Sequence, residues 1–567
     1  MKKQSKLSAF FLVSLFSILI SSCGNKYLTA EDPGTATIRI YKDNNSTSKE
    51  RFISPKRVKM KYNYTSLSGL LSENESVCPS LGDVNLLVIP VHIPGSTTYR
   101  TEEIRKNIEK VFFSKNDEKL GYKSVSEYFK ESSYGQLNFK GKVTDWFDVD
   151  QYTKIKRADQ VSYGSNGTII NDILPAAVSW AKTTQKVNLK DYDKNGDGAI
   201  DAVWLVYDHL DYLTNAEQEF LNNGTIGNVN YSFTNFTDWD YNTPNASENE
   251  DPTTSGFAWA SISSMLIGYC FRNADGIAIL NNLDSIKLDS HVYIRETCHL
   301  LGLESYNASD DSYYHPAGMT TMMDLSVGDL DSYSKMLLGW ITPYVVYGTS
   351  EILIPATSSS KHGVIVIPSN FEKISNEIEV AIANGTIDQF TYEFNPFSEY
   401  LMIDLYSPDG LNYIDTFGTL TNGSVACMNK TGVRIYHVDS RIFECKVLNY
   451  EGGQKLTYVD GYVWDEGELG DSNMILTPIN NQKNEESAYQ LPEEYMFFDQ
   501  IRLLEAHGIN TFNNGKYATE ETLWDSYSEP FDIANFGYQF FNANYGFNDG
   551  NALPFKIKVE TLKGVVL

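Results

Sequence analysis

The spacing of hydrophobic residues along the chain changes near residue 345. Before this point, the apolar run over residues 84–93 has the length of a strand, and Ile108 and Val111 belong to a helical repeat. After it, short alternating segments such as "GVIVIP" and "GVRIYHV" are separated by Gly, Asn and Asp turns. This pattern predicts an α+β fold, with mixed strands and helices over residues 81–345 and a mostly β region over residues 346–567 that partly continues the first unit.

Local signals predict the two ends of one helix in the first region. Ser124 and Glu127 have the spacing of a capping box, and the apolar pair Tyr128 and Phe129 follows them. The helical pattern ends at Gly135, and the alternating segment "QLNFKGKV" follows it. We therefore expect a helix followed directly by a strand.

Two polar stretches interrupt the hydrophobic pattern. Residues 24–80 are rich in Ser, Asn and Thr and carry mixed charge, which is typical of a flexible tether. Residues 209–256 are rich in Asn, Thr and Asp and follow an apolar strand directly. We expect the second stretch to be a surface insertion or a long functional loop.

The first residues predict export from the cell. Three lysines precede the apolar run over residues 9–20, which is short for a membrane span and has the length of a signal-peptide core. The run ends in "ISSC", which resembles the lipobox of bacterial lipoproteins and implies a signal peptide over residues 1–23 with lipidation of Cys23. The protein would then be anchored to the outer face of the membrane by its acyl chains. The alternative is an ordinary signal peptide with an incidental cysteine.

The overall charge restricts the possible partners. The formal net charge is -27, from 46 Lys and Arg against 73 Asp and Glu, so nucleic acid is not an expected partner, whereas hard cations are. Apart from Cys23, five cysteines remain, and an odd, sparse set does not predict a disulfide framework.

A short acidic turn is a candidate calcium site. The segment "DYDKNGDGAID" places oxygen-bearing side chains at alternate positions around a glycine turn, namely Asp193, Asn195, Asp197 and Asp201. Such a loop directs oxygen ligands toward one point, as Ca²⁺ requires, although the bidentate Glu of an EF-hand is absent. A solvated acidic turn without metal is the alternative.

The segment "YIRETCHLLGLESYN" resembles the zinc-binding helix of a metalloprotease, whose pattern is H-E-x-x-H-x-x-G. Glu296 and His299 stand in their expected places, but Arg295 replaces the first histidine and Ser305 replaces the third ligand. Arginine has no lone pair to donate and repels a divalent ion, and serine is a poor ligand for zinc. Zinc binding is therefore doubtful.

Other residues near this helix were considered for chemistry. Glu304 adjoins the third-ligand position, whereas His291 lies two turns before His299, about 12 Å along a helix axis. Cys298 is next to His299, but adjacent helical residues point about 100° apart, which disfavours a nucleophile–base pair. We expect Cys298 to be a small packed residue.

The surroundings of this helix resemble the immune inhibitor A family of secreted bacterial metallopeptidases. The segment "GMTTMMDLSVGDLDSYSKMLLGWITP" is similar to its Met-turn region, and the blocks "VSEYFKESSYGQLNFKGKVTDWF" and "KNGDGAIDAVWLVY" are similar to its opening helix and strand and its acidic loop. "YLMIDLY" and "TGVRIYHVDSRI" resemble the strands that follow. The resemblance implies a zincin-like fold.

The resemblance also implies residue roles. Glu296 takes the general-base position, which is vestigial without zinc. His299 takes a zinc-ligand position, and Met323 lies in the Met-turn. The acidic loop takes the place of a calcium site. As a hypothesis, the guanidinium of Arg295 replaces the missing zinc and pairs with Glu296 or Glu304, because a buried carboxylate without a cation costs several kcal/mol.

Three functions remain open from the sequence. The first is a non-catalytic surface lipoprotein, a pseudoprotease whose cleft binds a polypeptide or a host or surface protein. The second is an active metalloendopeptidase that uses His299, Glu304 and a further histidine, His315 or His437. The third is a structural lipoprotein without a ligand. The loss of two of three zinc ligands favours the first.

Overall fold

The computed structural model describes the following residues: 32–42, 56–57, 78–95, 100–162, 167–208, 235–237, 251–254, 256–266, 287–303, 306, 315–324, 326, 328–369, 380, 397, 399–417, 428–439, 445–450, 453–458, 475–476, 499–541, 546–547 and 550–565. Within them, no helix has the length and apolar character needed to span a membrane. The predictions for residues 1–23 and Cys23 lie outside this part of the chain.

The first unit is built on a mixed sheet with the strand order β4-β3-β7-β10-β8, and β5 also pairs with β3. All of these pairings are parallel except that of β8 with β10. The strands are β3 (Gly82–His92), β4 (Leu137–Val143), β5 (Phe147–Asp148), β7 (Val203–Tyr207), β8 (Asn235–Thr237) and β10 (Phe257–Ser261). A short parallel pair joins β6 (Ala199–Ile200) to β9 (Thr253–Thr254).

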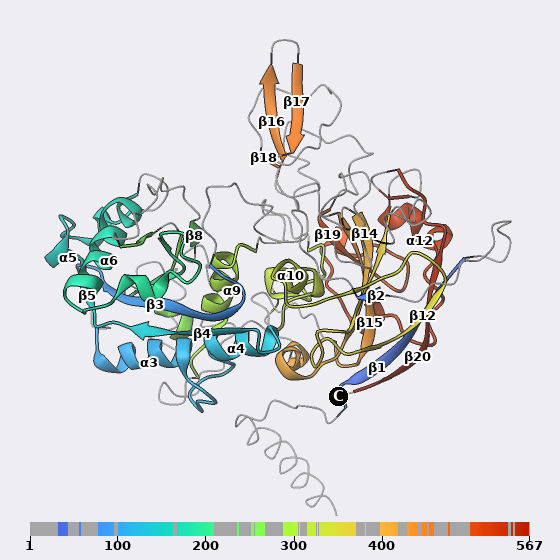
Figure 1. Cartoon of the computed structure of the whole chain (residues 1–567), viewed down its shortest axis with the longest axis horizontal. Helices are drawn as coiled ribbons and strands as arrows, with labels where there is room; N and C mark the ends of the chain where they lie inside the picture. Colours follow the sequence, from blue (N-terminus) through green and yellow to red (C-terminus); the bar gives the residue numbers. More distant parts are fainter. Residues whose placement is uncertain are drawn as a thin grey trace, which may run out of the picture.

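Helices cover both faces of this sheet (Figure 1). In β7, Trp204 and Val206 belong to one hydrophobic core, whereas Val203 and Leu205 belong to the other. The helices are α3 (Glu102–Phe113), α4 (Val125–Ser132), α5 (Val149–Tyr152), α6 (Leu174–Thr183), α8 (Ser263–Leu266), α9 (His291–Leu300) and α10 (Ser332–Leu337). The short helical turns are η1 (Ala158–Gln160), the π-helical η2 (Ile169–Ile173), η3 (Leu189–Tyr192) and η6 (Met322–Asp324).

The capping signals around α4 are confirmed in part. Ser124 is the N-cap, and its side chain accepts a hydrogen bond from the N–H of Glu127 at 3.2 Å. The Glu127 carboxylate, however, accepts from the N–H of Asn116 at 3.0 Å and does not complete the predicted capping box. Positive φ angles at Tyr134 and Gly135 turn the chain from α4 into β4.

The second unit contains two sheets with a hydrophobic core between them. One sheet has the order β12-β1-β20, and the other has the order β19-β15-β14-β13-β11-β2. The strands are β1 (Gly34–Tyr41), β2 (Lys56–Arg57), β11 (Tyr344–Val345), β12 (Ser350–Pro355), β13 (Val364–Pro368), β14 (Glu399–Tyr406), β15 (Gly432–Asp439), β19 (Ile501–Leu504) and β20 (Lys556–Gly564). The helical elements here are η9 (Gly410–Phe417), η11 (Phe512–Asn514), η12 (Glu520–Thr522) and α12 (Ile533–Phe540).

The two units share a core. On β14, Leu401 and Ile403 face the core between the two sheets, whereas Tyr400 and Met402 belong to the core that also contains residues of α4 and α9. Figure 1 shows α10 between the α/β unit and the β-rich unit. A separate small sheet contains β16 (Cys445–Tyr450), β17 (Gly453–Tyr458) and β18 (Ile475–Leu476).

One boundary prediction needs correction, and a second stays a prediction. The predicted tether over residues 24–80 is wrong for β1, because Ala36, Ile38 and Ile40 are fully buried and β1 pairs with β12 and β20. The predicted insertion over residues 209–256 is only partly described, and its described parts include β8, which pairs with β10. A three-residue strand is too short to produce a recognisable alternation.

Candidate functional site

Helix α9 carries the metalloprotease-like motif and is held by polar contacts along its buried faces. The Tyr293 hydroxyl donates to the Ser261 carbonyl oxygen at 2.9 Å, and the Trp204 indole donates to the Thr297 hydroxyl at 3.2 Å. The helix ends where Gly302 adopts a φ of 86° and the Leu303 N–H bonds the Cys298 carbonyl. The residues of the motif therefore form a helix, and a glycine ends it.

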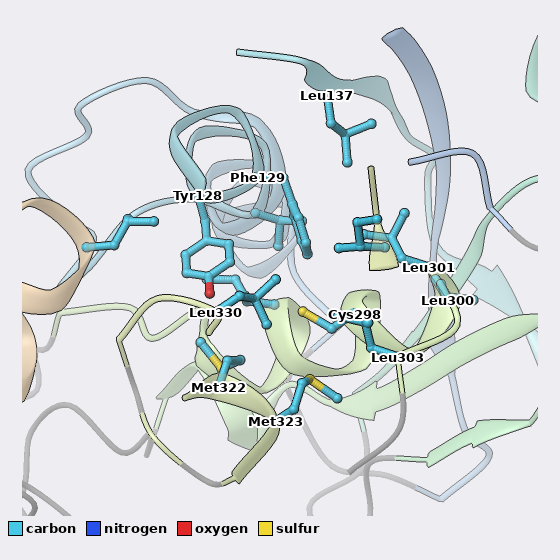
Figure 2. Packing of buried hydrophobic residues seen from close by; sticks show 14 of the residues in the cluster. Tyr128, Phe129, Leu137, Cys298, Leu300, Leu301, Leu303, Met322, Met323 and Leu330 are labelled. Atoms are coloured by element: carbon cyan, nitrogen blue, oxygen red, sulfur yellow. The ribbon is translucent and has the colours of Figure 1, made fainter. Parts of the chain in front are cut away.

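Cys298 is a packed residue, as the sequence predicts. Figure 2 shows its side chain in the hydrophobic cluster that also contains Phe129 and Leu330. Burial raises the pKa of the Cys298 thiol well above its ordinary value. The thiol therefore stays protonated, and it has no thiolate with which to act as a nucleophile.

His299 is held as a neutral ring. Burial, reinforced by the charge of Arg295, lowers its pKa to about 3. Its Nδ1 lies 2.6 Å from the Leu303 carbonyl oxygen, which can only accept, so the proton resides on Nδ1 and the lone pair on Nε2. One residue of the motif thus keeps the state that a metal ligand needs.

Arg295 connects α9 to the turn that contains Met323. Its Nη1 donates to the Met322 carbonyl oxygen at 2.9 Å, and the side chain is partly buried. Met322 and Met323 are buried beside α9 in the cluster of Figure 2. The guanidinium therefore does not simply point to solvent, and the Met322 carbonyl is a partner that the sequence did not reveal.

The predicted pairing of Arg295 with Glu296 or Glu304 stays a prediction. Glu296 is buried, with 4% of its surface exposed. Glu304 and Ser305 lie outside the described residues. A buried glutamate that follows Arg295 in the sequence agrees with the idea that this region requires a cation.

The two further histidines considered as ligands have other partners. His315 Nδ1 lies 3.0 Å from Oδ1 of Asp324. The other oxygen of Asp324, Oδ2, accepts hydrogen bonds from the N–H groups of Ala317 and Met319. His437 is 2.8 Å from Glu399 and packs against Phe541, in the second unit. His437 therefore lies in the wrong core to join His299, and that part of the alternative ligand set is wrong.

A zinc site does not fit the residues that the structure describes. No three His, Cys, Asp or Glu side chains among them come together as a set that could hold a metal ion. A guanidinium occupies the place of the first ligand and binds a backbone carbonyl. Of the two described ligand positions of the motif, only that of His299 holds a side chain that can bind a metal.

The Gly-Asp and Ser-Lys pairs that follow Met323 have a structural role. Lys335 and Asp329 form a buried ion pair at 2.5 Å, and the Lys335 ammonium also lies 4.8 Å from the centre of the Tyr134 ring. The Ser132 hydroxyl donates to Asp329 at 2.5 Å, which ties α4 to the same pair. The sequence shows the Gly-Asp and Ser-Lys pairs, but only the fold shows that they bind each other.

The acidic loop forms a tight turn around Asp193. The Asp193 carboxylate accepts hydrogen bonds from the N–H groups of Gly196, Asp197 and Gly198. Asp201 is buried, with 4% of its surface exposed, and one of its oxygens accepts from the Lys194 N–H at 2.8 Å. Its other oxygen, Oδ1, has no hydrogen-bond partner.

The electrostatics of this loop indicate a deficit of positive charge. The pKa of Asp201 is raised to about 7. Burial is the largest cause, the nearby carboxylates of Asp193 and Asp197 act in the same direction, and the hydrogen bond from the Lys194 N–H opposes them. Directly after the loop, β6 pairs with β9, so the loop is joined to the chain that returns at residues 253–254.

The comparison with protein families covers the first unit. Residues 93–255 match the model of the immune inhibitor A peptidase M6, catalytic domain. These residues, which lie in the mixed α/β unit, are therefore similar to a zincin-type M6 catalytic domain. No curated protein matches the chain.

The M6 match includes the acidic loop but ends before α9, which begins at His291. The family assignment and the altered motif thus rest on different residues. The similarity is limited to residues 93–255, and the chemistry of α9 has to be judged from Arg295 and His299 themselves.

Proposed function

We propose that this chain is a surface-anchored lipoprotein whose M6 fold acts as a non-catalytic module that binds a polypeptide or a partner protein. The observation that carries the proposal is the hydrogen bond of Arg295 to the Met322 carbonyl. This bond holds a permanent positive charge where the family motif requires a metal ligand.

The charge of Arg295 has two consequences for the site. It repels a divalent ion, and it contributes to the low pKa of His299. A peptidase of this class needs metal-bound water, and neither Arg295 nor His299 can activate water in its place. Glu296 in the general-base position is then left without the nucleophile it would activate.

The sheet supports polypeptide binding by the non-catalytic module. β8 is the last strand in the described order and runs antiparallel to β10. An edge strand offers backbone N–H and C=O groups to an extended peptide, and this mode of binding needs no metal. A structural lipoprotein without a ligand is the alternative that a binding experiment would have to exclude.

The acidic loop is proposed to bind one structural Ca²⁺. The support is the buried Asp201 oxygen without a hydrogen-bond partner, close to the charges of Asp193 and Asp197. The carboxylates of the loop do not by themselves form a set of three metal ligands. The Asn195 side-chain oxygen and backbone carbonyls would therefore have to complete the set, since Ca²⁺ accepts neutral oxygens as well as carboxylates.

The metal content of residues 24–567, measured by elemental mass spectrometry after dialysis with trace zinc and calcium, tests both proposals. We expect about one calcium per chain and no stoichiometric zinc. Asp201→Asn should reduce the calcium content, and His299→Ala should change neither metal.

Opposite outcomes would contradict each proposal separately. Stoichiometric zinc that disappears in His299→Ala would favour the active metalloendopeptidase, with His299, Glu304 and His315 as its candidate ligands. Absence of calcium at millimolar concentrations of the free ion would exclude the calcium site without affecting the interpretation of Arg295.

A further inference from the structure

The contact between the two units contains an excess of buried acidic groups. Four aspartates and two cations meet there from α10, η9, β14, β15 and the described residues of 318–331, which we call the Met-turn segment. The aspartates are Asp329, Asp331, Asp404 and Asp415, and the cations are Lys335 and Arg434, all of them buried. We call this set the junction.

Three of the four aspartates are well satisfied. Asp329 pairs with Lys335, and Arg434 donates twice to Asp404, each time at 2.8 Å. Asp331 caps α10 and accepts hydrogen bonds from the Ser334 N–H, the Ser334 hydroxyl and the Thr321 hydroxyl. These contacts assign both cations and leave Asp331 and Asp415 without one, and of these two only Asp415 keeps an oxygen without a hydrogen-bond partner.

Asp415 has the poorest set of partners in the junction. It lies in η9 with 6% of its surface exposed. The Ser326 hydroxyl donates to its Oδ1 at 3.0 Å, whereas its Oδ2 has no hydrogen-bond partner. Oδ2 lies against Gly328, where a Cβ atom would come within 2.5 Å of it.

The groups facing Asp415 come from every element around it. Asp329 and Ser326 belong to the Met-turn segment, and Arg434 belongs to β15. Tyr128 belongs to α4, and its hydroxyl donates to the Gly328 carbonyl oxygen. Burial raises the pKa of Asp415 to about 7, while Ser326 and Arg434 oppose the shift and Asp329 adds to it. Arg434 is already bound to Asp404 and so compensates only partly.

We propose that the junction is a proton-dependent contact, in which a neutral Asp415 carboxyl holds η9 against the Met-turn segment and its ionisation loosens that contact. A neutral carboxyl fits the space beside Gly328 without a cation. An ionised one would be a buried charge whose Oδ2 has no donor, which is costly.

The direction of the pH effect follows from the pKa. The pKa of Asp415 in the folded protein is raised above 3.8, its ordinary value. Asp415 therefore contributes stability that is fully present below that value and is lost as the pH rises through about 7. Over this range unfolding releases one proton from Asp415.

Asp415→Asn tests the proposal, since its amide is neutral at every pH. From about pH 4 to about pH 7, the unfolding constant of the wild type should rise, relative to that of Asp415→Asn, by up to about tenfold per pH unit. The exposed Asp150→Asn serves as the matched control and should keep the wild-type profile. Parallel profiles for the wild type and Asp415→Asn would overturn the proposal.

Ser326→Ala and hydrogen exchange provide independent measurements. Removing the Ser326 hydroxyl takes away a donor to ionised Asp415, so the pKa of Asp415 in the folded protein should rise further. The pH range over which stability is lost should then extend to higher pH. Above pH 7, the α10 amides of the wild type should lose protection relative to those of α3, and Asp415→Asn should retain it. Equal protection in α10 and α3 at all pH values would show that no local contact loosens.

Discussion

At the scale of single residues, the Arg295 side chain joins α9 to the turn that contains Met323. Its donor group satisfies a backbone carbonyl of Met322, which is only 1% exposed. A zinc ligand at this position would make a different contact, because a histidine is too short and has too few donors to reproduce the guanidinium geometry. The substitution therefore changes both the metal chemistry and the packing of α9.

Replacing Arg295 should destabilise the protein. In Arg295→Ala the Met322 carbonyl loses this donor, and an unsatisfied buried group costs about 1–3 kcal/mol. Urea unfolding measures the change. Arg39→Ala, which removes a half-exposed arginine 3.7 Å from Glu560, is the control and should cost at most about 1 kcal/mol. Equal effects of the two variants would contradict a structural role of Arg295.

At the scale of elements, β1 shows that strands paired in one sheet can lie far apart in the sequence. Its residues alternate between buried and partly exposed positions, with Ile38 and Ile40 in the core between the two sheets. β1 lies between β12 and β20, and the nearest register partner on β20 is more than 500 positions away along the chain, for example Val559 opposite Ile38. The polar composition around β1 conceals this short alternation.

Deletion of β1 should destabilise the second unit. A chain that begins at residue 43 loses the buried side chains of Ile38 and Ile40, each of which contributes about 2 kcal/mol by burial, and leaves β12 and β20 unpaired. Urea unfolding and protease resistance measure the effect. A chain that begins at residue 32 retains β1 and should behave like the protein with the full tether. If β1 were only part of a tether, both truncated proteins would keep the stability and protease resistance of the full chain.

At the scale of the whole molecule, the described part of the chain runs from β1 in the second unit through the first unit and then returns to the second. β1 and β20, close to opposite ends of the sequence, lie side by side in one sheet. If Cys23 carries the lipid, the predicted anchor precedes β1 by about ten residues, which span at most about 36 Å. The second unit would then be the part held nearest to the membrane.

Cys23→Ser tests the anchoring. Without the thiol no acyl chain can be attached, and the protein should move from the membrane fraction to the soluble exported fraction while keeping its unfolding profile. Fractionation followed by immunoblotting measures the distribution. Cys78→Ser is a cysteine control and should stay in the membrane fraction. Retention of Cys23→Ser in the membrane would contradict the lipoprotein assignment.

The sequence by itself determined features that depend on local chemistry. The N-cap of α4 at Ser124, the glycine stop of α9 and the buried strand over residues 84–93 all follow from neighbouring residues. The incompatibility of Arg295 with a metal also needs no fold, because a guanidinium has no lone pair in any environment. These features were predictable since each depends on a few consecutive residues.

Only the tertiary structure decided which distant groups meet. It placed β1 between β12 and β20, joined Arg295 to Met322, put His437 in a different core from His299, and pressed Asp415 against Gly328. The physical reason is that burial and pairing depend on packing between segments far apart in the chain. No local pattern of hydrophobic and polar residues specifies which of the possible partners a buried group will contact.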